Sequence, residues 1–214
     1  SPDGDSMASS PTVNAATIAL NRFGLGARAD DTPPASPKAW LLAQFDQYQP
    51  RPAAWSSQPG SVALAADLAQ QRRQLQQNPQ NPQNPQSPQS ASDVAAKLEA
   101  RKAMRTEIRD VYRAAVNARI DSALTTQTPF IERMVHFWSN HFAVSSEKPG
   151  VAALAGAFEA EAIRPHVLGR FENMLVAVER HPAMQLFLDQ TRSVGPDSMA
   201  AMRAAQRNPG RRRG

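Results

Sequence analysis

The stretch "SDVAAKLEARKAMRTEIRDVYRAAVNARIDSALTT", residues 92–126, contains neither proline nor glycine and consists mostly of strong helix formers. Its apolar residues recur at the spacing of one helix face: Val94, Leu98, Met104, Ile108, Val111, Tyr112, Ala115, Val116 and Ile120. A helix of about 31 residues, rising about 1.5 Å per residue, spans roughly 45 Å. The sequence therefore predicts one long central helix.

Arginines share the apolar face of this predicted helix, because each residue turns the chain by about 100° around the axis. Arg101, Arg105 and Arg119 fall on the apolar side, and the acidic residues fall on the opposite one. A buried arginine needs a carboxylate or a bound anion. We therefore expect Arg101 and Arg105 each to meet a carboxylate or an anion, with candidate partners Glu132, Glu159, Glu161 and Asp189. The alternative is that their long stems cover the apolar face while the guanidinium groups reach solvent.

Shorter helices are predicted on both sides of the long one. Ser36 is a suitable N-cap for a helix that begins at Pro37, and Thr128 can cap another that begins at Pro129. Further helical segments cover residues 15–23, 151–164, 169–181 and 182–190. Because no segment shows β-alternation, the sequence predicts an all-α fold, an irregular multi-helix bundle.

The chain divides into five regions by composition. Residues 70–91 contain an Asn-Pro-Gln repeat with almost no apolar side chain, which predicts a disordered Pro/Gln-rich linker. The linker should separate an N-terminal helical segment, residues 11–69, from the main helical bundle, residues 92–197. We expect residues 1–10 to be a disordered tail or tag remnant, and residues 198–214 to be a basic C-terminal loop.

Composition excludes several classes of function. The chain has no cysteine, so disulfides, thiolate metal sites and a cysteine nucleophile are absent. The net charge is +5, but acidic residues are interspersed among the basic ones, and this pattern does not favour nucleic-acid binding. No run of about 18 apolar residues predicts a membrane span, and no signal peptide is visible.

Several segments occur together in one order: "LNRFGLGARADD" from Leu20, "AWLLAQFD" from Ala39, "ERMVHFWSNHFAVS" from Glu132, "IRPHVLGRF" from Ile163 and "HPAMQLFLD" from His181. Over residues 17–45 and 125–197 they resemble the bacterial family called domain of unknown function 1800. The resemblance implies a helical protein, often exported and often encoded beside a partner family, with no established reaction. It favours a periplasmic or secreted location, and the lack of a visible signal peptide leaves a cytoplasmic one open.

The resemblance also implies more helices after the region that matches "QTRSVGP". We therefore expect the chain to be the N-terminal portion of a longer domain. Its missing C-terminal part and a protein partner are the expected binding partners.

His141 is the leading candidate for chemistry, because an imidazole beside aromatic rings can act as a base or a metal ligand. Asn140 accompanies it in the family motif, and Asp189 is a candidate acidic partner. The alternative for His141 is a structural histidine. Glu132 and His136 have a spacing that suits a metal, but an ion pair explains it equally well, so no metal or cofactor is assigned.

Basic residues mark candidate anion sites: Arg22, Arg101, Arg105, Arg164 and His166. Arg164 and His166 flank Pro165, although helix C-terminal charges explain that cluster as well. Two hypotheses follow. The protein is a non-catalytic or assembly component that acts with a partner, or it is a hydrolase- or oxidoreductase-like enzyme, with or without a metal, centred on His141, Arg164 and Asp189.

Overall fold

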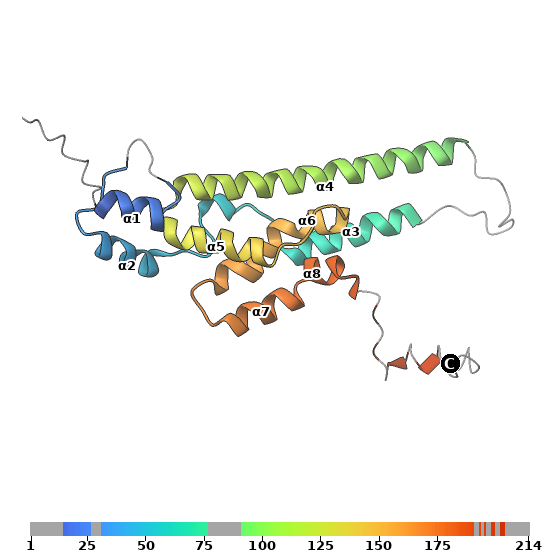
Figure 1. The fold of residues 1–214 in the computed structure, drawn as a ribbon. Coiled ribbons are helices and arrows are strands. Elements are labelled where there is room, and N and C mark those ends of the chain that lie inside the picture. Colours follow the sequence, from blue (N-terminus) through green and yellow to red (C-terminus); the bar gives the residue numbers. More distant parts are fainter. Residues whose placement is uncertain are drawn as a thin grey trace, which may run out of the picture.

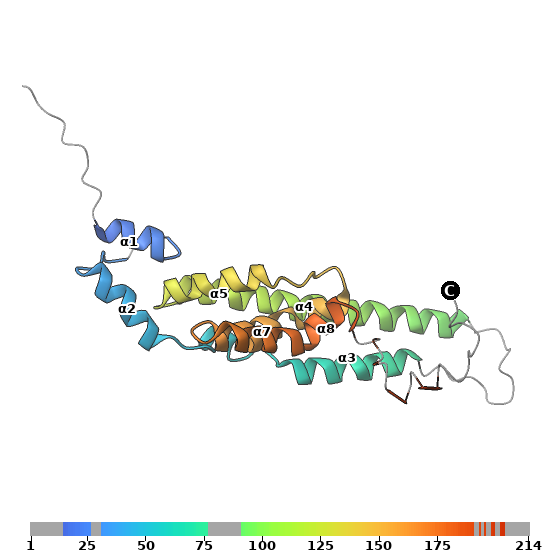
Figure 2. The same cartoon turned by 60° about the horizontal axis from the view of Figure 1, so that its bottom comes forward.

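The structure is a computed structural model, and it describes residues 15–26, 31–76, 91–190, 193, 195, 198–199 and 202–203. In these residues it contains eight α-helices and no strand, which confirms the all-α prediction (Figures 1 and 2). The helices are α1 (Ala15–Phe23), α2 (Pro37–Gln47), α3 (Ser61–Gln76), α4 (Ala91–Thr125), α5 (Pro129–His141), α6 (Pro149–Phe158), α7 (Phe171–Arg180) and α8 (Pro182–Phe187). Three single turns, η1 (Ala53–Trp55), η2 (Glu159–Ile163) and η3 (Arg164–His166), complete the helical structure.

Helix α4 is the long helix that the sequence predicts, and it runs along one edge of the molecule (Figure 1). Its buried residues are Ile108, Ala115, Ala118 and Ser122, spaced so that they form one narrow seam. The seam packs closely on α6, where a Cβ added to Gly156 would collide with the Cβ of Ala115. Small residues at this crossing therefore set how closely the two helices approach.

Much of the predicted apolar stripe on α4 is not packed, although Met104 and Val111 do pack against buried core residues. Val94, Leu98, Tyr112, Val116 and Ile120 are all exposed. Because α6 packs on the seam, the residues that the structure describes leave the neighbouring flank of α4 exposed.

The expectation that Arg101 and Arg105 lie on a packed face is wrong. Both residues are exposed, and neither has an ion pair with any residue that the structure describes. The physical reason is that α3, which runs beside the N-terminal half of α4 (Figure 1), packs on Met104 and Ile108 and not on the side that carries Arg101 and Arg105. Of the three predicted arginines, Arg119 alone is paired within the described ranges, with Glu159.

The main core surrounds α6. Leu154, Ala157 and Phe158 of α6 pack with Val135 of α5 and with residues of α7 and α8. Leu64 of α3 belongs to the same core, so the segment before the predicted linker is built into the bundle. Helix α3 also continues through residues 70–76, where the linker was expected to begin. Glutamine, arginine and leucine are good helix formers, and no proline occurs between Gly60 and Pro79. The predicted linker from 77 to 90 lies outside the described residues.

Helices α1 and α2 dock on α5 through side-chain hydrogen bonds. The Nη1 of Arg133 donates to the carbonyl oxygens of Asn21, Arg22 and Gly24 at 3.4, 3.0 and 3.2 Å, which caps the end of α1. The Oε1 of Gln44 accepts the Phe130 N–H at 2.8 Å.

The two predicted N-caps differ in outcome. Ser36 caps α2 as predicted, because its Oγ accepts the Ala39 N–H at 3.4 Å. Thr128 makes no side-chain capping bond to α5, since Gln44 has taken that role from α2.

Every helix within the described ranges is too short or too polar to cross a lipid bilayer.

Candidate functional site

Two arginines and two glutamates form an ion network at the centre of the bundle, and all of them are buried except Arg119, whose side chain is 36% exposed. Arg164 is completely buried, and its guanidinium makes two parallel hydrogen bonds to the Glu132 carboxylate, one of them from Nη1 to Oε2 at 3.1 Å. Its Nε donates to the Oε1 of Glu159 at 3.2 Å. The other oxygen of Glu159 is 3.3 Å from the Nε of Arg119. Two positive and two negative charges therefore balance, as burial requires.

A π-helical turn gives this network its shape. In η2 the Arg164 N–H donates to the Glu159 carbonyl five residues earlier, instead of four as in an α-helix. The wider turn places the side chains of these two residues on the same side of the chain, where they form their ion pair. Pro165 follows at once and lacks an N–H, which ends the regular helix.

Aromatic side chains from the N-terminal region cover the network. The Tyr48 hydroxyl donates to the Arg164 carbonyl at 2.9 Å, and the Trp55 ring centre lies 4.7 Å from the guanidinium carbon of Arg164. Burial raises the pKa of Tyr48, so it remains a neutral donor. Burial opposes the charge of Arg164, but the bonds and charge of Glu132 dominate and raise its pKa.

His136 borders the network as a neutral ring. Its Nε2 lies 3.6 Å from the Oε1 of Glu132, so the predicted i,i+4 contact is present. Burial and then the charge of Arg119 lower the pKa of His136. Among the described residues no group of three or more histidine, cysteine or acidic side chains could hold a metal ion.

A second polar cluster joins α3 to α8. The Glu161 carboxylate accepts the Ser61 N–H at 2.7 Å and the Ser61 hydroxyl at 2.5 Å. The Nδ1 of His181 accepts the Ala183 N–H at 3.1 Å, which leaves Nε2 protonated to donate to Glu161 at 3.3 Å. Burial lowers the pKa of His181 despite this carboxylate. The Glu161 carboxylate caps the start of α3 and the His181 ring caps the start of α8, so this cluster is structural.

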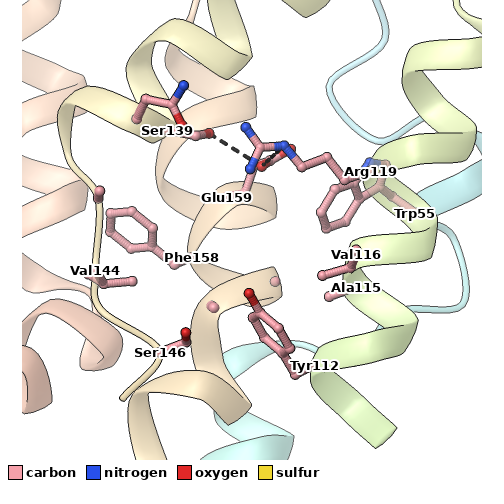
Figure 3. A pocket seen from close by; sticks show the side chains of 14 residues that line it. Trp55, Tyr112, Ala115, Val116, Arg119, Ser139, Val144, Ser146, Phe158 and Glu159 are labelled. Atoms are coloured by element: carbon pink, nitrogen blue, oxygen red, sulfur yellow. Dashed lines mark hydrogen bonds and ion pairs between the residues drawn. The ribbon is translucent and has the colours of Figure 1, made fainter. Parts of the chain in front are cut away.

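A pocket of about 240 Å³ opens beside the network, between α4, the end of α5 and α6 (Figure 3). Tyr112 and Val116 of α4 form one wall, and Val144 and Phe158 face them across the pocket. Arg119 and Glu159 meet at one end, where the Ser139 hydroxyl also donates to Glu159 at 3.3 Å. The indole N–H of Trp55, another lining residue, is buried and has no hydrogen-bond partner among the described residues.

A family model described as "Protein of unknown function (DUF1800)" matches residues 18–208, most of the chain. The chain belongs to this family. The matched span includes the predicted linker, which the resemblance left out. No match was found among curated proteins or among solved structures.

The three catalytic candidates of this DUF1800 protein lie in different surroundings. Asn140 lines the pocket. His141 is exposed at the end of α5 and contacts aromatic rings, with ring centres 4.7 Å from Phe142 and 5.4 Å from Trp138. Asp189 is exposed at the surface, where its carboxylate is 2.8 Å from the Nζ of Lys148.

The anion-binding candidates of the DUF1800 chain do not form one cluster. Arg22 is on α1, Arg101 and Arg105 are on α4, and Arg164 and His166 are on η3. In the described part of the chain, Arg164 is the member of this group that contacts carboxylates, and those carboxylates are internal.

Sequence reasoning missed the pocket and the way the network residues of the DUF1800 fold pair. Glu132 and Glu159 were recognised as partners for buried arginines, but Arg164 and Arg119 use them instead of Arg101 and Arg105. Tyr48 and Trp55 gave no signal, because they reach Arg164 from more than 100 residues away in the chain. The sequence signal that could have identified the network was Arg164, which directly precedes Pro165 in an otherwise apolar segment.

Proposed function

We propose that this DUF1800 protein is a non-catalytic component of an exported bacterial assembly and acts by binding a partner protein. The supporting observation is an uncovered row of large apolar side chains on α4, here called the α4 row: Tyr112, Val116, Ile120 and Leu124. These residues are 37% to 63% exposed and follow one another at intervals of four, so they share one side of the helix. Export itself rests on the family resemblance alone.

The α4 row has the character of an interface. Removing apolar area from water contributes about 25 cal/mol per Å², so a partner that covers adjacent apolar side chains gains binding energy. Contiguous exposed apolar patches on a folded protein mark interaction sites. Tyr112 and Val116 also form a wall of the pocket, so the row continues into a recess that can hold a partner side chain.

The charged groups support a structural role over catalysis. The carboxylates of Glu132 and Glu159 are both held by arginines, which leaves neither poised as a general base. An enzyme centred on His141, Arg164 and Asp189 has less support. The guanidinium of Arg164 is fully buried, whereas the Asp189 carboxylate is 78% exposed and paired with Lys148.

The test is the size of the native complex. Full-length protein carrying Val116→Asp and Ile120→Asp is compared with wild type, after expression in the source bacterium, by size-exclusion chromatography with light scattering. Val62→Asp with Val176→Asp is the matched control, because both residues are exposed but lie on α3 and α7. We expect wild type and control to elute in a larger complex that the α4 variant loses. Elution of wild type as a free monomer under all conditions would refute the proposal.

A further inference from the structure

The flank of α4 that contains most of the α4 row also carries unpaired arginines. Arg101, Arg105 and Arg109 are exposed, and none has an ion pair with a residue that the structure describes. At about 100° per residue they fall within one sector, about 100° wide, together with five exposed apolar residues. These are Val94, Leu98, Tyr112, Val116 and Ile120, and we call the eight residues the α4 flank.

The α4 flank contains no acidic residue. The five acidic residues of α4 all lie outside the sector: Asp93, Glu99, Glu107, Asp110 and Asp121. Asp110 instead pairs with Arg113 beside the flank. The flank is therefore both apolar and uniformly basic, which restricts what can cover it.

Three kinds of occupant fit this flank poorly. A second copy of the chain would bring a basic flank against another basic flank, without carboxylates to pair with. A lipid bilayer suits a helix whose charges border an apolar strip. Around the helix axis, however, Arg105 lies in the middle of the sector, between the angular positions of Tyr112 and Val116, so its charge would face the apolar part of the bilayer. Nucleic acid would pair with the arginines but leave five apolar side chains without partners.

We propose that the α4 flank binds an acidic amphipathic helix of the partner protein. Carboxylates spaced four residues apart on that helix would face Arg101, Arg105 and Arg109, and its apolar residues would cover the α4 row. The flank spans 27 residues from Val94 to Ile120, about 40 Å of helix, so a long partner helix can be accommodated. This inference rests on the proposed function and names the partner's chemistry.

The pocket provides the anchor point for such a helix. Its wall residues Tyr112 and Val116 belong to the flank, so a large apolar side chain of the partner can enter the pocket from the row. Arg119 is partly exposed at one end of this pocket, and only its Nε is used by Glu159. In the described part of the chain its two Nη groups have no partner, so they are available to a carboxylate beside the inserted side chain.

Binding of defined probes tests the chemistry directly. The full chain is titrated with a labelled helical peptide that carries leucine at i, i+4 and i+7 with glutamate between, and with the same peptide in which lysine replaces glutamate. Vesicles of phosphatidylglycerol and phosphatidylcholine form a third arm, and fluorescence anisotropy or sedimentation reports binding. We expect the acidic peptide to bind and the lysine peptide and vesicles not to bind.

Charge reversal locates the binding to the flank. Arg101→Glu, Arg105→Glu and Arg109→Glu together should weaken acidic-peptide binding on the order of tenfold or more, because three attractive pairs become repulsive. The control reverses Lys38, Arg73 and Arg180, which changes net charge equally on other surfaces and should leave binding unchanged. Circular dichroism should show both variants folded, since none of these side chains has an ion pair within the described ranges. Equal effects of the two triple variants, or vesicle binding in place of peptide binding, would overturn the inference.

A photo-crosslinking residue at position 116, in the source bacterium, separates this inference from the proposed function. Mass spectrometry identifies the segment that is captured. The inference is supported if the captured segment is an acidic amphipathic helix and if its capture is lost when Arg101, Arg105 and Arg109 are changed to glutamate. A captured partner segment of another kind refutes it and leaves the proposed function standing. The absence of any captured protein refutes both.

Discussion

Replacing Arg164 by methionine should destabilise the protein severely. The change keeps an apolar stem but removes the cation that holds two buried carboxylates, since Glu132 is 2% and Glu159 is 5% exposed. In the variant, Glu159 keeps its ion pair with Arg119. Glu132 keeps only the His136 ring, whose Nε2 is 3.6 Å from its Oε1, and this ring is neutral because its pKa is lowered. Removing one partner of a buried ion pair costs about 3–5 kcal/mol. In a domain of this length each kcal/mol lowers Tm by about 2–4 °C, so the expected loss is roughly 6–20 °C.

Thermal and urea unfolding monitored by circular dichroism measure this effect. Arg170→Met is the matched control, because Arg170 also pairs with a glutamate but is 75% exposed, and it should change stability by less than about 1 kcal/mol. The double variant Arg164→Met with Glu132→Gln removes both charges, so it should be more stable than Arg164→Met alone. If Arg164→Met proves as mild as the Arg170 control, the reasoning that the buried charges depend on one another fails.

Three further predictions follow from the helix contacts. Arg133→Met removes the cap on the end of α1, so hydrogen exchange in residues 15–23 should accelerate while exchange in α6 stays the same. Exchange in residues 15–23 at the wild-type rate would count against the capping role. Gly156→Ala places a Cβ against Ala115 and should cost about 1–3 kcal/mol in urea unfolding, whereas Gly150→Ala meets ordinary contact distances and should be nearly neutral. Burial lowers the pKa of His181 below its usual 6.5, so the unfolded chain binds the proton more readily and the free energy of unfolding should fall as pH drops below about 6.5. His181→Asn keeps a helix-capping side chain and should flatten this dependence of stability on pH. An unchanged slope in the variant would contradict this assignment.

Local sequence signals predicted the helices well, because the residues that start and stop them act over a few positions. Pro37, Pro129 and Pro182 each open a helix, and the long proline-free stretch before Pro129 is the long helix α4. Periodicity also identified correctly which residues of α4 share a face. It could not say how much of that face is covered, since coverage depends on where α6 ends in space.

The ion network was harder to predict, because its members are far apart in the sequence. Arg164 and Glu132 are separated by 32 residues, and both were individually visible as candidates. Choosing the correct pair required the π-helical turn, and no propensity rule marks that turn in "EAEAI". Thr128 failed as a cap for a related reason, since Gln44 reaches the same helix end from 86 residues away.

The π-helical turn at Glu159–Ile163 also makes chain length at this point more critical than residue identity. Such a turn contains one residue more than an α-helical path over the same ground. Deleting Ala160 or Ala162 would let the chain relax into a regular α-helix, and every later residue would then rotate by about 100° relative to α6. Arg164 would leave Glu159 and Glu132, and α7 and α8 would turn away from the core. Related DUF1800 chains should therefore differ here by substitution and not by insertion or deletion, as an alignment of the segment from Phe158 to Pro165 would show.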